Sequence, residues 1–426
     1  MTDRRATAEA FHAARGAGSA AAAGLLSLDQ ACARAASFVR PIPDAETVPL
    51  SAAVGRVLAR PLMARIAIPP FTQSAMDGYA ILAGQGLAAG TGLIVIDRIP
   101  AGHPGRPLGA GEAARIFTGA PLPEGADAVI MQEHVLGDAG RIVLGREIRA
   151  GDNVRPRGED IDPPELILAK GTRLDPRHIG LIAAQGYCDV TVVARPRIAV
   201  VSTGDELRQP GDRLAPATIY DSNRLMLLAL ITAAGFEARD GGWVPDAPQA
   251  IAERLGSLAG DTDLIVTTGG ASAGDEDHSA TALTLAGGLG GALRIALKPG
   301  KPAVVGRIGA TGYLGLPGNP VASLVTWMLL GQAMTSALTG ARSHRDRGYP
   351  LKSLSWYRRR PGRTEFVPAI LSEDAQGLIG IEILGRGGSA RLRPLAIADG
   401  LAEIPPQADG IEPGDELHFH PFRSII

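Results

Sequence analysis

Two apolar segments of this chain run directly into glycine turns that carry carboxylates. Residues 264–277 read LIVTTGGASAGDED, and residues 200–206 read VVSTGDE. In open α/β sheets, ligands bind beyond the carboxyl ends of the strands. Glycine lets backbone N–H groups approach an anion closely, whereas carboxylates repel an anion unless a divalent cation lies between them. Together the two segments predict a phosphorylated ligand that is held partly through Mg²⁺.

Two further loops carry groups that suit an oxyanion. Residues 297–302 (LKPGKP) place two lysines on a proline-rich turn, and lysine is a compact charge suited to phosphate. Residues 316–320 (LPGNP) place a glycine turn before a helix start, whose partial positive charge also favours anions. A single loop of this kind is commonly a solvated turn, but four of them at strand ends of one sheet favour a phosphate-binding site.

The four loops supply most of the candidate ligand-binding residues. The metal-ligand candidates are Glu206, Asp275 and Asp277. The cofactor-binding candidates on the loops are Ser202, Gly204, Asp205, Gly269, Gly270, Ser272, Gly274, Pro317, Gly318 and Asn319.

No nucleophile–base pair or zinc motif stands out in the rest of the sequence. The 8 histidines are scattered, and the 2 cysteines are too few for a cysteine zinc site or a disulfide framework. His278 is open to two interpretations, as a cap for the following helix or as a ligand contact. A bound cation, rather than an activated side chain, would therefore supply the electrophile.

The elements that position these loops form an alternating pattern over residues 196–340. Apolar strands are expected at 198–202, 264–268, 293–297, 303–306 and 313–316. Helices are expected at 221–234, from 248 onward, at 279–286 and from 320 onward. Strands that alternate with helices predict a central, mostly parallel, doubly wound α/β domain.

The flanking segments predict β-rich domains. Short apolar runs between Gly and Pro indicate an inserted β-rich domain at 69–151, surrounded by a linker or dimerisation domain made of 25–68 and 152–195. Helices are expected there at 27–39, 51–59 and 176–185. Alternating runs at 365–371, 378–384, 390–397 and 416–419 predict a small C-terminal β-barrel at 341–426. Residues 1–24 have the composition of a disordered tail.

Length and composition limit the class of protein. A chain of 426 residues is long enough for two to four domains, and 45% apolar with 20% charged residues indicates a folded protein. A net charge of −2 gives no reason to expect nucleic acid or an anionic membrane as partner. No uninterrupted apolar run reaches about 18 residues, so no membrane span is expected, and a cytoplasmic location is the default expectation.

The motifs together resemble the MoeA family, the molybdopterin molybdenumtransferases, whose eukaryotic relatives include the gephyrin E domain. A TGGxS-type loop alone also resembles molybdopterin adenylyltransferases and competence-damage-inducible proteins, whereas SAMDGYA followed by RGEDI is far more specific. The resembling stretches are SAMDGYA (74–80), FTGAPLPEGADAVIMQE (117–133), RGEDI (157–161), STGDEL (202–207), IYDSNR (219–224), TTGGASAGDED (267–277), LKPGKP (297–302) and LPGNP (316–320).

The resemblance implies a homodimer that inserts molybdenum from molybdate into adenylylated molybdopterin, with Mg²⁺ and release of AMP. Its partners would be molybdopterin and molybdate, and other molybdenum-cofactor proteins or molybdoenzymes could join them. The resemblance also implies further cofactor-binding residues, which are Thr118, Arg363 and Ser389. The implied catalytic residues are Asp77, Asp160, Glu206, Asp246, Asp277, Lys298 and Lys301.

Two departures from the family pattern and two alternative functions remain open. Thr72-Gln73 stands where the family often has Asp-Asn, and Arg294 stands where it often has Lys, which changes geometry and hydration at equal charge. A molybdopterin adenylyltransferase is one alternative, although the long segment before residue 196 argues against it. A peptide-binding scaffold is the other, although the acidic loops argue against a purely structural role.

Overall fold

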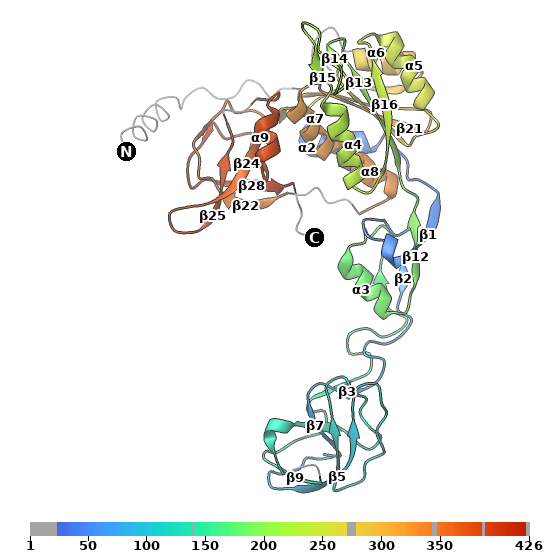
Figure 1. Cartoon of the computed structure of the whole chain (residues 1–426), viewed down its shortest axis with the longest axis vertical. Helices are drawn as coiled ribbons and strands as arrows, with labels where there is room; N and C mark the ends of the chain where they lie inside the picture. The colour runs from blue at the N-terminus through green and yellow to red at the C-terminus, as the bar shows by residue number, and fades with distance from the viewer. Residues whose placement is uncertain (1–23, 138–139, 271–277, 343–346, 386–387, 423–426) are drawn as a thin grey trace. The chain divides into compact units, whose positions relative to one another are not determined.

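The computed structural model describes residues 24–137, 140–270, 278–342, 347–385 and 388–422. These residues form two compact units. The larger unit consists of the described residues of Met1–Ala59, Gly171–Arg177 and Asp189–Ile426, and the smaller unit of those of Arg60–Lys170 and His178–Cys188. Figure 1 labels the elements of both. The domain boundaries drawn from the sequence stay a prediction.

A six-stranded sheet forms the centre of the larger unit. Its order is β16 (Glu237–Val244), β13 (Arg197–Thr203), β17 (Leu264–Thr268), β21 (Thr311–Leu316), β20 (Pro302–Ile308) and β18 (Leu289–Arg294). The first four strands pair in parallel, and β20 and β18 add antiparallel pairs. Every residue of β17 is buried, as expected for a strand covered on both faces. The predicted α/β fold class is confirmed.

The register brings the strand ends that carry the predicted loops to one edge of this sheet. β20 runs antiparallel to β21, and Val304 faces Gly315, so the start of β20 lies beside the end of β21. Arg294 at the end of β18 faces Pro302 in the same way. The carboxyl ends of β13, β17, β21 and β18 and the beginning of β20 therefore share this edge.

Helices cover both faces of the sheet (Figure 1). α5 (Pro248–Leu258) and α6 (His278–Leu285) pack on one face. α2 (Leu28–Ala36), α4 (Asn223–Ala233), α7 (Pro320–Thr326) and α8 (Gln332–Thr339) pack on the other, with α7 and α8 joined by the π-helical turn Trp327–Gly331.

The joined helix Pro320–Thr339 is the only described helix that is long and apolar enough to cross a membrane. Its most apolar stretch is 67% buried inside the protein. Val321, Leu324, Leu330 and Met334 belong to the apolar core on this face of the sheet. The helix therefore packs as a core helix.

The C-terminal part of the larger unit forms a second sheet, which closes into a barrel. Its order is β19 (Leu297–Lys298), β24 (Thr364–Glu373), β26 (Gly400–Ile404), β28 (Glu416–Pro421) and β22 (Tyr349–Lys352), with β25 (Ile379–Ile383) also paired to β24. A bridge between Ser353 and Ile381 joins β25 to the segment after β22. β23 (Tyr357–Arg358) pairs with β27 (Gly410–Ile411) beside this sheet.

The short strand β19 connects the two sheets of the larger unit. It follows β18 in the chain, yet it pairs in parallel with β24 of the barrel, where Leu297 faces Thr364 and Lys298 faces Glu365. The Thr364 amide also donates to the Ala296 carbonyl at 2.9 Å.

The smaller unit is built on a third six-stranded sheet. Its order is β7 (Ala128–Met131), β4 (Gly78–Ile81), β6 (Glu112–Ile116), β5 (Gly92–Ile99), β9 (Arg141–Leu144) and β8 (Val135–Gly137). The strand pairs β3 (Gln73–Ser74) with β10 (Val154–Arg155) and β2 (Leu62–Met63) with β11 (Leu166–Leu168) complete it. β1 (Ala45–Pro49) pairs with β12 (Asp189–Val193) in the larger unit. α3 covers Pro176–Ala184.

Three expected elements are wrong or displaced. The strand expected at 390–397 is a helix, α9 (Leu392–Ile397), with Pro394 in its first turn, where a missing N–H costs little. The helix expected at 51–59 is only a 3₁₀ turn, Leu50–Ala52, because Gly55 takes a φ of 81° that a helix does not allow. The strand expected at 293–297 ends at Arg294.

Candidate functional site

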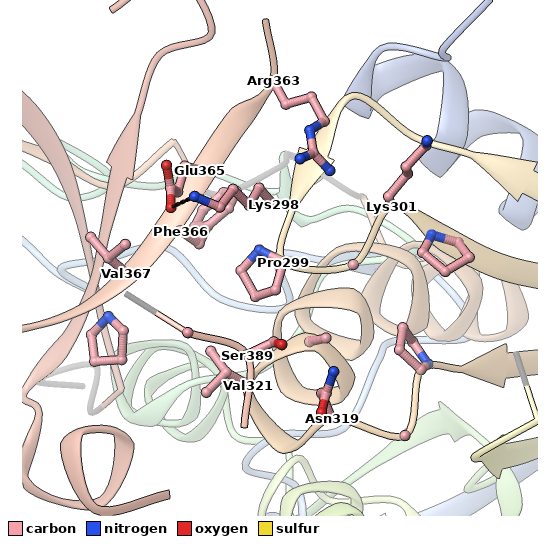
Figure 2. Close-up of a pocket in the computed structure, with 17 residues that line it drawn as sticks. Lys298, Pro299, Lys301, Asn319, Val321, Arg363, Glu365, Phe366, Val367 and Ser389 are labelled. Carbon is pink, nitrogen blue, oxygen red and sulfur yellow. Dashed lines mark ion pairs between the residues drawn. The ribbon is translucent and has the colours of Figure 1, made fainter. Parts of the chain in front are cut away.

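A cavity of about 480 Å³ opens where the shared sheet edge meets the barrel. We call it the basic pocket, because three cationic side chains line it: Lys298, Lys301 and Arg363. Figure 2 shows its lining. The predicted site residues that it brings together are Lys298, Lys301, Pro317, Gly318, Asn319, Arg363 and Ser389.

Lys298 is held in the pocket by a buried carboxylate. Its Nζ lies 2.7 Å from Oε1 of Glu365, and the Glu365 side chain is only 2% exposed (Figure 2). The Tyr357 hydroxyl donates to the same oxygen at 2.9 Å. Nε of Arg359 lies 3.6 Å from Glu365 Oε2. An ammonium group has three donors, so this contact leaves two of them for a ligand.

The Glu365 cluster, formed by Glu365, Tyr357, Arg359 and Lys298, is protected from solvent on the barrel side. Burial raises the pKa of Tyr357, and the neighbouring charge of Glu365 raises it further, so the phenol stays protonated and donates. Burial lowers the pKa of Arg359, an effect that Glu365 opposes. Oε1 of Glu365 thus accepts from Tyr357 and contacts Lys298, whereas Oε2 has no hydrogen bond among the described residues and faces only the charge of Arg359. The two neighbouring cations offset the cost of burying this carboxylate.

The other two cations of the pocket lie on separate segments. Nη1 of Arg363 donates to the Leu297 carbonyl at 3.4 Å, which ties the barrel segment to β19. Figure 2 shows Lys298 directed toward Glu365 and Lys301 directed away from it. The Ser389 carbonyl accepts from the Val321 amide at 3.0 Å, so the Ser389 backbone is fixed at the start of α7.

The remaining loops of the sheet edge carry carboxylates, and we call this region the acidic edge. It comprises Asp205 and Glu206 after β13, Asp246 before α5, and Gly269-Gly270 after β17. The Asp246 amide donates to Oδ1 of Asp205 at 3.2 Å, and both Asp205 and Glu206 are exposed. Carboxylate oxygens are the ligands that Mg²⁺ prefers.

A glycine is required at position 269. Its φ is 104°, and a Cβ there would lie 2.2 Å from the Thr203 carbonyl oxygen. A Cβ at Gly318 would lie 3.7 Å from Cα of Gly269, so the loops after β17 and β21 touch. This contact connects the acidic edge to the basic pocket.

Some predicted residues are placed differently or lie outside the described part. The Ser202 hydroxyl is fully buried and donates to Oδ2 of Asp221 at 2.6 Å, so it faces the protein interior. Asp275 and Asp277, with Ser272 and Gly274, lie outside the described residues. Within the described ranges, no group of three or more His, Cys, Asp and Glu side chains is arranged to hold a metal.

Two of the three predicted residues of the smaller unit form a pair. The amide and the hydroxyl of Thr118 both donate to Oδ1 of Asp77 at 2.8 Å. These hydrogen bonds lower the pKa of Asp77, and the one from the Thr118 backbone amide has the larger effect. Asp160 is exposed on a separate loop, where its amide donates to the Ile68 carbonyl at 2.9 Å.

Three family models match consecutive parts of the chain. They describe the MoeA N-terminal region (domain I and II) at residues 26–186, a probable molybdopterin binding domain at 199–336, and the MoeA C-terminal region (domain IV) at 351–422. The chain is 31% identical over 406 residues to the molybdopterin molybdenumtransferase of Haemophilus influenzae, covering 94% of this chain and 100% of that protein. The chain belongs to the MoeA family.

Further relatives agree with this membership. Molybdopterin molybdenumtransferase 2 of Mycobacterium tuberculosis is 35% identical over 385 residues, covering 87% of this chain and 93% of that protein. The crystal structure of the molybdopterin biosynthesis MoeA protein from Pyrococcus horikoshii superposes with a TM-score of 0.75 at 27% identity, over 93% of this chain and 100% of that one. The MoeA resemblance drawn from the motifs is confirmed.

MoeA motifs alone did not identify the residues that hold Lys298 in place. Glu365 stands two residues after Arg363, at the start of a strand that the sequence predicts. Its role depends on the pairing of β19 with β24, which joins segments more than sixty residues apart. The only available signal was the unusual placement of an acid at the start of an apolar strand, TEFVPAIL.

Proposed function

We propose that this MoeA-family chain is a molybdopterin molybdenumtransferase, which inserts molybdenum from molybdate into adenylylated molybdopterin and releases AMP. One observation carries the proposal: the basic pocket, with its three cations, adjoins the exposed carboxylates of the acidic edge, and both lie at the same edge of one α/β sheet. The named activity of the relatives from Haemophilus influenzae and Mycobacterium tuberculosis supports it.

The basic pocket suits the molybdate oxyanion. Lys298 retains two N–H donors beyond its contact with Glu365, and Lys301 and Arg363 add a second ammonium and a planar guanidinium. Ser389 and Asn319 contribute neutral polar groups to the same lining. Donors that are already in position need no rearrangement when negative charge develops, which is how such groups accelerate a reaction.

The acidic edge suits Mg²⁺ and the phosphate end of the adenylylated pterin. Asp205, Glu206 and Asp246 present hard oxygen donors, and we propose that Asp275 and Asp277 complete the set. Mg²⁺ bound there would polarise the phosphoanhydride and neutralise the leaving phosphate. The backbone turns at Gly204, Gly269, Gly270 and Gly318 would let N–H groups approach the phosphates.

Several further properties belong to this proposal. They are a homodimeric assembly, a cytoplasmic location and contacts with other molybdenum-cofactor proteins or molybdoenzymes. Asp77, Thr118 and Asp160 stay predicted site residues, and the Asp77–Thr118 pair supports a role for that carboxylate as an ionised group, because its hydrogen bonds favour the charged form.

A direct assay tests the proposed function. Purified protein is incubated with adenylylated molybdopterin, molybdate and Mg²⁺, and AMP release is measured together with the mass of the pterin product. AMP release that requires both molybdate and Mg²⁺ supports the proposal. Formation of adenylylated molybdopterin from ATP and molybdopterin would instead identify an adenylyltransferase, and no turnover in either assay would favour a scaffold.

A matched pair of variants assigns the activity to the basic pocket. Lys301→Ala should lower molybdate-dependent AMP release about 100-fold, because it removes one of the three cations that line the pocket. Lys352→Ala, at an exposed position of β22 in the barrel, removes the same charge at a residue that does not line the pocket and should leave the rate unchanged. Equal rates for the two variants would overturn the assignment of the pocket.

A further inference from the structure

Asn223, at the start of α4, forms a bridge between two of the ligand loops. Its Nδ2 donates to Oγ1 of Thr268 at 2.9 Å and to the Gly318 carbonyl at 2.7 Å. Thr268 ends β17, directly before Gly269, and Gly318 lies in the loop that follows β21. Both hydrogens of one amide group are thus used to join the loop of the acidic edge to the loop of the basic pocket.

The arrangement is not the one that stability alone would favour. Asn223 is only 9% exposed, and its Oδ1 is a buried acceptor with no hydrogen-bond partner among the described residues. A buried acceptor without a partner is unfavourable, whereas an apolar side chain of similar size would avoid that cost. A buried polar group in such a position needs a structural or functional explanation.

The residues around Asn223 anchor the segment to a third strand. Oδ2 of Asp221 accepts from the Ser202 hydroxyl at 2.6 Å and from Nε of Arg224 at 2.9 Å. All three side chains are buried. The segment Asp221–Arg224 is therefore fixed to the end of β13 through Ser202, and it cannot follow a movement of either loop without breaking buried hydrogen bonds.

We propose that Asn223 is a positioning residue that couples Gly269 and Gly270, the described residues after β17, to the turn at Gly318 after β21, so that both present their backbone groups to adenylylated molybdopterin as one unit. The proposal rests on the proposed function, because it names how that substrate's site is held together. Asn223 itself lies behind the loops, and it acts through Thr268 and Gly318.

Two variants that conserve side-chain size test the coupling. Asn223→Leu removes both donors, and Thr268→Val removes one acceptor. Each should raise the KM for adenylylated molybdopterin about tenfold and change kcat by less than about twofold, because the loops lose alignment and the pocket cations are untouched. The double variant should be no worse than Asn223→Leu alone, and Thr268→Ser should restore the wild-type KM.

The controls separate positioning from stability. Thr232→Val, on the exposed face of the same helix, makes the same chemical change and should leave KM unchanged. The midpoint of urea unfolding should stay within error for Asn223→Leu, because the variant also removes the unpaired Oδ1. The proposal would be overturned if Asn223→Leu left KM unchanged and lowered the unfolding midpoint. It would also be overturned if the rise in KM of the double variant equalled the product of the rises in the two single variants.

A second measurement does not require turnover. In Thr268→Val, amide hydrogen exchange at Gly318 and Asn319 should accelerate, although the Asn223–Gly318 hydrogen bond is chemically intact. Unchanged exchange there would show that the loops are independent, and the coupling would be wrong. If the wild-type chain released no AMP, the proposed function would fail, and the exchange result would still decide the coupling.

Discussion

The basic pocket and the acidic edge lie on one side of the same sheet, but their charged groups are held in different ways. In the pocket, Lys298 is bound to Glu365, which is buried beneath Tyr357 and Arg359. On the acidic edge, Asp205 and Glu206 are exposed. One pocket cation is thus tied to a buried carboxylate of the barrel, whereas the described carboxylates of the acidic edge face solvent. Substitutions should therefore cost stability in the pocket and cost mainly function at the acidic edge.

The largest expected effect is on the pocket side. Glu365→Ala leaves the buried Arg359 guanidinium without its counter-ion and the Tyr357 hydroxyl without its acceptor, and we expect a loss of about 3–5 kcal/mol in the free energy of unfolding. Urea unfolding measures it. Glu373→Ala, at the exposed end of the same strand, should stay within about 0.5 kcal/mol. Similar losses for the two would show that Glu365 is not a buried anchor.

One backbone position of the acidic edge, Gly269, leaves no room for a side chain. Gly269→Ala places a Cβ 2.2 Å from the Thr203 carbonyl at a φ of 104°, and we expect about 2–4 kcal/mol of destabilisation. Gly287→Ala is the control, because its φ is also positive, 73°, but no atom lies within 4 Å of the added carbon. It should cost about 1 kcal/mol. Thermal unfolding of both variants distinguishes steric contact from backbone strain.

Alkaline pH should weaken the pocket side. Burial raises the pKa of Tyr357 in the folded state, so the stability that the neutral phenol contributes is complete below its ordinary pKa of about 10 and is lost as the pH rises toward the folded value. Above about pH 10, wild-type stability should fall faster than that of Tyr357→Phe, by at most about 1.4 kcal/mol per pH unit. Tyr349→Phe, at an exposed tyrosine, should follow the wild type.

The smallest effect on stability is expected for Asp205→Asn. The amide oxygen can still accept from the Asp246 N–H, so the free energy of unfolding should change by less than about 0.5 kcal/mol. The Mg²⁺ concentration that gives half-maximal AMP release should rise about tenfold, since one ligand charge is lost. A large loss of stability without a change in the Mg²⁺ requirement would remove the contrast between the two regions.

The sequence predicts the inner strands of the central sheet well, because they are buried on both faces, whereas the half-exposed outer strands β16 and β18 are missed or displaced. The run LIVTT followed by two glycines gives β17 the bounds that the structure shows, Leu264–Thr268. The segment 390–397 misleads, since its first residues, ARLR, alternate as a strand does, and the position of Pro394 in a first helical turn becomes evident only in three dimensions. Periodicity does not decide between the two for so short a segment.

The candidate site also contains residues that the sequence reveals and residues that it does not. Lys298, Lys301 and the glycine turns are found because they belong to contiguous motifs. Glu365 and Asn223 act through partners that are distant in sequence, across a strand pair between two sheets and across two loop ends. Such contacts depend on register, which composition and local spacing do not contain.

The pairing of β19 with β24 also constrains how this protein can evolve. Leu297 and Lys298 are encoded within the α/β segment but complete the sheet of the barrel. A recombination event or an engineered chimera that joined the barrel to a foreign α/β domain would have to supply a dipeptide that pairs with β24. Without it, the edge of β24 would be exposed and the Glu365 carboxylate would lose Lys298 as its counter-ion. We therefore expect the two to be inherited, and best transplanted, as one block.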